Sequence, residues 1–136
     1  MVNGMKTVSV NKGLYSNYLK KAAECFEAAN DSLLRQNNNA TVINAIHCAI
    51  SASDALLVFF KGIRSAGQSH EDVISLLRSL EFDKDEINNK IRQLQKLLHI
   101  KNSAEYEEKL MTESNALSSI KNAERFFKWV EDMLTE

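Results

Sequence analysis

Residues 40–60 constrain the fold more than any other part of this sequence. Of these 21 residues, 15 are apolar, and they occupy every side of a helix instead of one stripe. Such a helix has to be covered on several sides, and a second copy of the chain can bury part of its surface. Asn44, His47 and Asp54 interrupt the segment, which argues against a membrane span. We therefore predict a central helix from Ala40 to about Lys61.

Four other segments repeat apolar residues at three- and four-residue steps, which is the spacing of one helix face. The first of these helices runs from Leu14 to the turn-forming "RQNNN", and the second is short and capped by Ser69. The third runs from a cap at Asp83 or Asp85 to Leu98, and the fourth from Ala116 to Leu134. The sequence has no proline and only 4 glycines, so turns are few. We predict an all-α fold, an up-and-down bundle of four long helices plus one short helix. A single domain over residues 13–136 follows a flexible lead-in over residues 1–12.

Charge and cysteine content narrow the functional classes. A net charge of -1 argues against a broadly cationic nucleic-acid binder, although a local basic patch is compatible with it. Cys25 and Cys48 are too few for a disulfide framework and lack metal-ligand spacing, so we expect buried thiols and no metal site or cofactor. The first 13 residues contain no apolar core of signal-peptide length, and we expect a cytoplasmic protein.

The stretch "HIKNSAEYEE", residues 99–108, separates the last two apolar stripes. It can be a plain connector, an active site or the remnant of one. In the plain interpretation it is a helix-end connector whose Tyr106 packs on the bundle and hydrogen-bonds through its hydroxyl.

Three stretches in this order resemble the HEPN family of prokaryotic helical proteins: "AIHCAISASDALL", "SHEDVISLLRSL" and "LLHIKNSAEYEE". The resemblance implies a dimeric helical bundle. Toxin members of this family are similar to metal-independent ribonucleases. The resemblance implies that such members use a motif of an Arg, then four to six residues, then a His. In such a site the histidine moves a proton at the ribose 2′-hydroxyl, and the guanidinium holds the phosphate.

Lys101 and Tyr106 stand where the resemblance places that arginine and histidine. Lysine keeps the charge but loses the planar fork, and tyrosine is a poor base at neutral pH. We therefore interpret the stretch as a remnant or repurposed site, in which Lys101, Asn102 and Tyr106 bind a phosphate or a nucleotide edge. Catalytic residues are not identified there.

Arg64 and His70 are weak catalytic candidates. They stand at a spacing within the toxin range, but in the loop before the third helix, where His70 is more simply a first-turn residue. His47 is interpreted as a core or interface histidine. Asp54 can face the bundle rim, pair with Arg64 or pair with a dimer mate, because a buried carboxylate is costly alone.

The function predicted from these patterns is a non-catalytic HEPN-like binding module for a nucleotide, RNA or a partner protein. A homodimer and a small nucleotidyltransferase partner are implied by the resemblance. The alternative is a metal-independent ribonuclease toxin that uses Arg64 and His70, or a divergent site around Lys101 and Tyr106. The aromatic run "FFKWVEDML" near the end of the chain is interpreted as core or interface packing and not as a surface on which bases stack.

Overall fold

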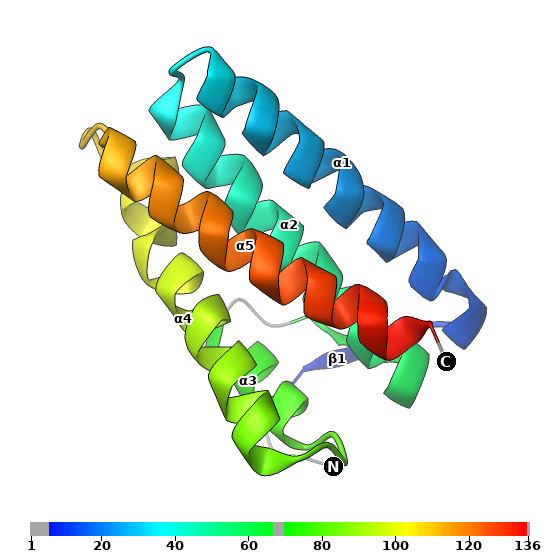
Figure 1. Ribbon diagram of the computed structural model, residues 1–136. Helices are drawn as coiled ribbons and strands as arrows, with labels where there is room; N and C mark the ends of the chain where they lie inside the picture. The colour runs from blue at the N-terminus through cyan, green and yellow to red at the C-terminus, as the bar shows by residue number, and fades with distance from the viewer. Residues whose placement is uncertain (1–5, 67–69, 136) are drawn as a thin grey trace.

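The computed structural model describes residues 6–66 and 70–135 (Figure 1). Within these ranges the elements are strands β1 (Thr7–Ser9) and β2 (Ile63–Ser65), the 3-10 helix η1 (Lys12–Leu14), and helices α1 (Tyr15–Leu34), α2 (Asn38–Lys61), α3 (His70–Arg78), α4 (Lys84–Tyr106) and α5 (Glu113–Leu134). Four helices are long and α3 is short, which confirms the predicted all-α bundle.

Helix α2 lies at the centre of the bundle, as its composition predicted. It packs against α1, α5 and α4 (Figure 1). Its fully buried apolar residues are Val42, Ala45, Ile46, Cys48, Ala49, Ala52, Ala55, Leu56, Leu57 and Val58. The helix is long and apolar enough to cross a membrane by length and composition, but 61% of its most apolar window is buried inside the bundle, as in a core helix. One chain therefore buries most of α2, and the homodimer stays a prediction.

Local signals set most helix ends. Gly62 ends α2 in the left-handed region, with a φ of 66°, which favours glycine because it has no Cβ. The Asp83 side chain accepts a hydrogen bond from the Glu86 N–H over 2.9 Å, so Asp83 is the cap of α4. Thr112 and Asn115 form a reciprocal capping box at the start of α5. The predicted cap at Ser69 lies outside the described residues.

The two strands were not predicted from the sequence. Strand β1 pairs antiparallel with β2, and Val8 is the partner of Arg64. The described part of the predicted lead-in is thus a strand followed by η1, since its backbone hydrogen-bonds to the chain leaving α2: Val10 N–H donates to Gly62 O over 2.8 Å. This pairing joins segments more than fifty residues apart, and no local pattern reports it.

Helix α4 is longer than predicted. The stretch over residues 99–108, interpreted as a remnant or repurposed site, is helical as far as Tyr106, because Ile100 and Ala104 continue the apolar face and pack against the core. Lys101 and Glu105, one turn apart, form an ion pair of 2.7 Å. The candidate residues of this stretch therefore project from a rigid helix.

The C-terminal aromatic residues lie in the core, which is one of the two positions predicted for them. Phe126, Phe127 and Trp129 are buried. The Trp129 indole N–H donates a hydrogen bond of 2.6 Å to Glu86 of α4, which satisfies its polar atom.

Candidate functional site

A cavity of about 430 Å³ opens between α2, β2, α3 and α4, and we name it the Arg64 cavity. Its lining residues are Ile50 and Asp54 of α2, Arg64 and Ser65 of β2, His70 and Val73 of α3, and Leu94, Leu98, Lys101 and Tyr106 of α4. Its volume lies in the range of small-molecule sites, and its lining combines apolar side chains with polar and charged ones, as such sites do.

Arg64 is positioned by the two-stranded sheet. Its pairing with Val8 fixes the backbone of β2 at the cavity wall. One guanidinium nitrogen, Nη1, donates to the Ser65 carbonyl oxygen over 3.1 Å. Among the described residues Arg64 forms no ion pair with a carboxylate. A guanidinium in this condition has donors left for a planar anion such as phosphate.

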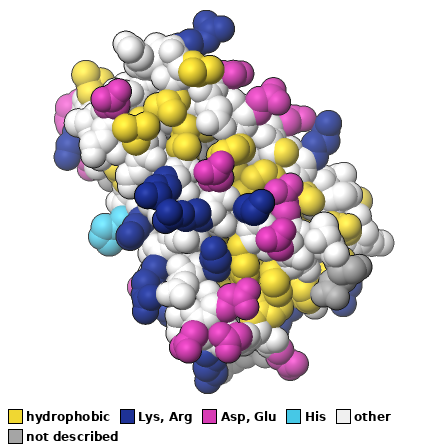
Figure 2. Space-filling view, in the orientation of Figure 1, with side chains coloured by type: hydrophobic (Ala, Val, Ile, Leu, Met, Phe, Trp, Pro, Cys, Tyr) yellow, Lys and Arg dark blue, Asp and Glu magenta, His cyan; other side chains and the backbone are white. Residues whose placement is uncertain are grey.

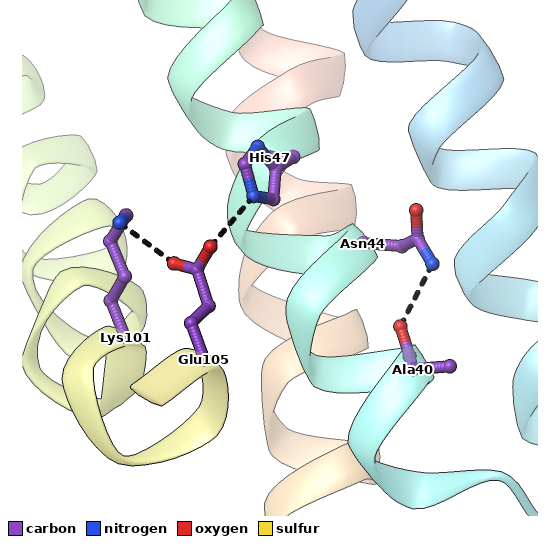
Figure 3. A network of polar contacts seen from close by, with 5 residues as sticks. All are labelled: Ala40, Asn44, His47, Lys101 and Glu105. Atoms are coloured by element: carbon purple, nitrogen blue, oxygen red, sulfur yellow. Dashed lines mark hydrogen bonds and ion pairs between the residues drawn. The ribbon is translucent and has the colours of Figure 1, made fainter. Parts of the chain in front are cut away.

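Lys101 belongs to a three-residue network between α4 and α2 (Figure 3). The Glu105 carboxylate lies between Lys101 and His47: Lys101 Nζ is 2.7 Å from Oε2, and His47 Nε2 is 3.1 Å from Oε1. The hydrogen bond to Glu105 raises the pKa of Lys101. Burial opposes ionisation of Glu105, but the hydrogen bonds from Lys101 and His47 outweigh it and lower the pKa of Glu105. The network thus holds the ammonium charge of Lys101 in place.

Tyr106 lies at the last turn of α4 with 74% of its surface exposed. Lys101 Nζ lies 5.3 Å from the centroid of its ring, a cation–π distance. The plain interpretation, in which Tyr106 packs on the bundle, is therefore wrong. An exposed ring at the mouth of a cavity is available for stacking on a planar ligand.

Two further titratable groups face the cavity. Burial raises the pKa of Asp54 from 3.8 to about 6, and the charges of Arg64 and Lys21 offset this effect only in part. Burial, followed by the charge of Lys101, lowers the pKa of His70, so its imidazole is neutral at pH 7. The cavity therefore holds a fixed cation, a neutral imidazole and a carboxyl group that ionises close to neutral pH.

Ser65 adds a hydroxyl to the cavity wall. Its Oγ is buried and finds no hydrogen-bond partner among the described residues.

Over the same residues, no group of three or more His, Cys, Asp or Glu side chains is arranged to hold a metal ion.

The structure brings the two sets of sequence candidates into one place. Arg64 and His70, treated as a separate weak pair, line the same cavity as Lys101 and Tyr106. Asn102, predicted to bind the ligand with Lys101 and Tyr106, does not line the cavity; its side-chain amide donates to Glu107 over 3.1 Å at the end of α4. Asp54 lines the cavity beside Arg64, whose charge partly offsets the effect of burial on the pKa of its carboxyl group, but the two form no ion pair, and pairing with a dimer mate stays a prediction.

Only the structure shows that His47 and Glu105 belong to the polar network at the site. His47 is a surface residue whose side chain is 46% exposed, so it does not lie in the core of the chain, and its interpretation as an interface histidine stays a prediction. Glu105 was not singled out at all. The signal that could have found it is its spacing of four from Lys101, which on a continuous helix forms an ion pair.

A family model described as the HEPN domain matches residues 15–133, which include all the residues that line the Arg64 cavity. The chain belongs to the HEPN domain family. This membership supports a nucleotide- or RNA-related module or a ribonuclease-type protein. A search of curated proteins gives no match to the chain.

Proposed function

We propose that this protein binds a nucleotide unit, free or within RNA, in the Arg64 cavity and does not cleave it. The observation that carries the proposal is the meeting of Arg64, Lys101 and Tyr106, from β2 and α4, around one cavity of about 430 Å³. Family membership supports the nucleotide class.

Arg64 is assigned to the phosphate. Its fork has donors that no described carboxylate occupies, and bidentate guanidinium–phosphate contacts are strong and directional. Lys101 adds a point charge whose position Glu105 holds. The ring of Tyr106 is assigned to stacking on the base, an interaction worth about 1–3 kcal/mol per base.

Asp54 makes this binding pH-dependent. Its carboxyl group lines the same cavity, and its pKa is about 6. The ionised form repels phosphate, whereas the protonated form does not. Affinity for a phosphate ligand is therefore expected to rise as the pH falls from 7.5 to 6.

The test is fluorescence anisotropy with a 5′-fluorescein dinucleotide whose riboses are 2′-O-methylated, so that cleavage cannot occur. We expect Arg64→Ala to weaken binding about tenfold or more and Arg64→Lys to weaken it less, because lysine keeps the charge without the fork. The double variant Lys101→Ala, Tyr106→Ala should weaken it as well. Arg35→Ala, at an exposed position after α1, is the matched control. Affinity that is equal in Arg64→Ala and the control would end the proposal.

A ribonuclease is the second candidate, and one observation favours it: Arg64 and His70 line the same cavity. Neutral His70 would take the proton of the ribose 2′-hydroxyl, whose oxygen then attacks phosphorus. The bond from phosphorus to the 5′-oxygen breaks, that oxygen takes up a proton, and a 2′,3′-cyclic phosphate remains. Arg64 would stabilise the charge that develops on the phosphoryl oxygens.

An RNA cleavage assay in EDTA separates the two functions. Under the binding proposal, folded wild-type protein leaves the RNA intact. Cleavage that His70→Ala or Tyr106→Phe abolishes would instead establish the nuclease. Cleavage that persists in both variants would indicate a contaminating enzyme.

We further propose a cytoplasmic homodimer that works with a small nucleotidyltransferase, as the family resemblance implies. Light scattering on a size-exclusion column tests the dimer, because a 15.4 kDa chain should then elute with twice that mass.

A further inference from the structure

A second hollow lies between α4 and α5, with a volume of about 410 Å³, and we name it the α4–α5 groove. Four cationic side chains line it, Lys90, Arg92 and Lys96 from α4 and Arg125 from α5. Figure 2 shows Lys and Arg side chains gathered on the face that carries these two helices. In a chain of net charge -1, this is a local concentration of positive charge.

No carboxylate of the described residues forms an ion pair with the four cations of the groove. The one acidic side chain of the groove, Glu86, accepts the hydrogen bond from the Trp129 indole. Arg92 also donates a hydrogen bond of 2.8 Å to the Asn89 side chain, which leaves its charge unchanged. Four cationic side chains against the one carboxylate of Glu86 leave the groove with an excess of positive charge for an external anion.

Amide side chains also line the groove. The Gln93 Oε1 atom is buried and has no hydrogen-bond partner among the described residues, and Asn122 is only 8% exposed. Buried amides of this kind can exchange hydrogen bonds with a polar ligand. The groove thus offers hydrogen-bonding groups as well as positive charge.

Adjacent hollows connect the groove with the Arg64 cavity around α4. The groove shares Arg92 and Lys96 with a hollow on α4, and that hollow shares Gln95 and His99 with a hollow between α4 and α3. The last hollow shares His70 and Leu98 with the Arg64 cavity. The path crosses from the α5 side of α4 to its α3 side. Lys90 and Lys101, at the two ends, lie about 16 Å apart along the helix axis, too far for a single phosphate to contact both.

We propose that the α4–α5 groove binds the phosphates of a single-stranded polynucleotide that crosses α4 and places one nucleotide in the Arg64 cavity. The inference rests on the proposed function. Lys and Arg side chains line the two ends of the path, the groove and the Arg64 cavity, whereas the hollow next to the cavity is lined by His70, His99 and the acidic Glu71. The exposed ring of Tyr106 lies at the cavity end, and cationic grooves combined with aromatic rings bind single strands. A duplex is disfavoured because the path bends around one helix, whereas duplex DNA is stiff over about 150 base pairs.

The test compares two 2′-O-methylated, 5′-fluorescein probes, a dinucleotide and a 12-nucleotide strand, by anisotropy at several salt concentrations. The groove variant is Arg92→Ala, Lys96→Ala, Arg125→Ala. The matched control is Lys12→Ala, Arg35→Ala, Lys109→Ala, which removes the same charge from other exposed positions. All these side chains are exposed, so both proteins should fold.

We expect the groove variant to bind the 12-nucleotide strand about tenfold or more weakly than the control, with a salt slope lower by about 2. Both variants should bind the dinucleotide equally. Equal affinity of the two variants for the long strand overturns the inference and leaves the cavity proposal standing. If wild-type protein binds neither probe, both proposals fail. If a poly-glutamate peptide displaces the 12-nucleotide strand as well as unlabelled RNA does, the groove takes an acidic peptide and the inference is wrong.

Discussion

Replacing Asp54 with asparagine measures the cost of placing a carboxylate in the Arg64 cavity. Burial raises the pKa of this carboxyl group from 3.8 to about 6. The folded protein therefore holds the proton of Asp54 at pH values where the unfolded chain has already released it. Because the folded state binds more protons, stability falls as the pH rises through this range.

The magnitude follows from the two pKa values. Below pH 3.8 the group is protonated in both states and contributes nothing to the pH dependence. Well above pH 6 it is ionised in both states, and the difference of about two pH units corresponds to about 3 kcal/mol of lost stability. At pH 5 roughly half of this loss, about 1.5 kcal/mol, is present.

Urea unfolding of wild-type protein and Asp54→Asn at pH 5 and pH 8 tests this. Asparagine has nearly the same shape and carries no charge at either pH, so its substitution relieves the loss. The stability of the variant relative to wild type should increase by about 1.5 kcal/mol between pH 5 and pH 8. Asp31→Asn, at an exposed position near the end of α1, controls for the general effect of removing a negative charge.

A pH-independent difference between Asp54→Asn and wild type would refute the reasoning. It would mean that Asp54 is solvated, or paired with Arg64 closely enough to cancel the effect of burial. The same change in Asp31→Asn would attribute the effect to net charge.

Three other changes test the packing and capping of the bundle. Asp83→Ala removes the cap of α4 and should cost about 1 kcal/mol in urea unfolding, while Asp85→Ala, which removes no cap, should cost clearly less. Phe126→Ala empties a fully buried site and should cost about 3–5 kcal/mol; a cost below 1 kcal/mol would contradict the assigned core. Burial, with smaller contributions from Cys25 and Glu131, raises the pKa of the Cys48 thiol to about 12. Mass-detected alkylation at pH 8 should therefore modify Cys48 only as fast as the protein unfolds, and rapid modification of native protein would contradict its burial.

The helical architecture was predictable because its signals are local. The apolar stripes of α1, α4 and α5 repeat at helical spacing, and the apolar residues of α2 surround the helix on all sides, so α2 had to be central. Asp83 was one of two caps considered for α4, and a hydrogen bond to the Glu86 N–H identifies it. The end of α4 was predicted near Leu98, whereas the helix continues to Tyr106. The apolar positions Ile100 and Ala104 were not recognised because charged and polar residues surround them in the sequence.

By itself, the sequence determined the fold class, the central helix and the family resemblance, because periodicity, caps and short motifs depend on neighbouring residues. Only the tertiary structure decided the site. Arg64 reaches the cavity through a strand pairing with Val8, and Asp54, His70 and Lys101 meet it from three different helices. The raised pKa of Asp54 is likewise a property of the folded chain, because it arises from burial that the surrounding helices create.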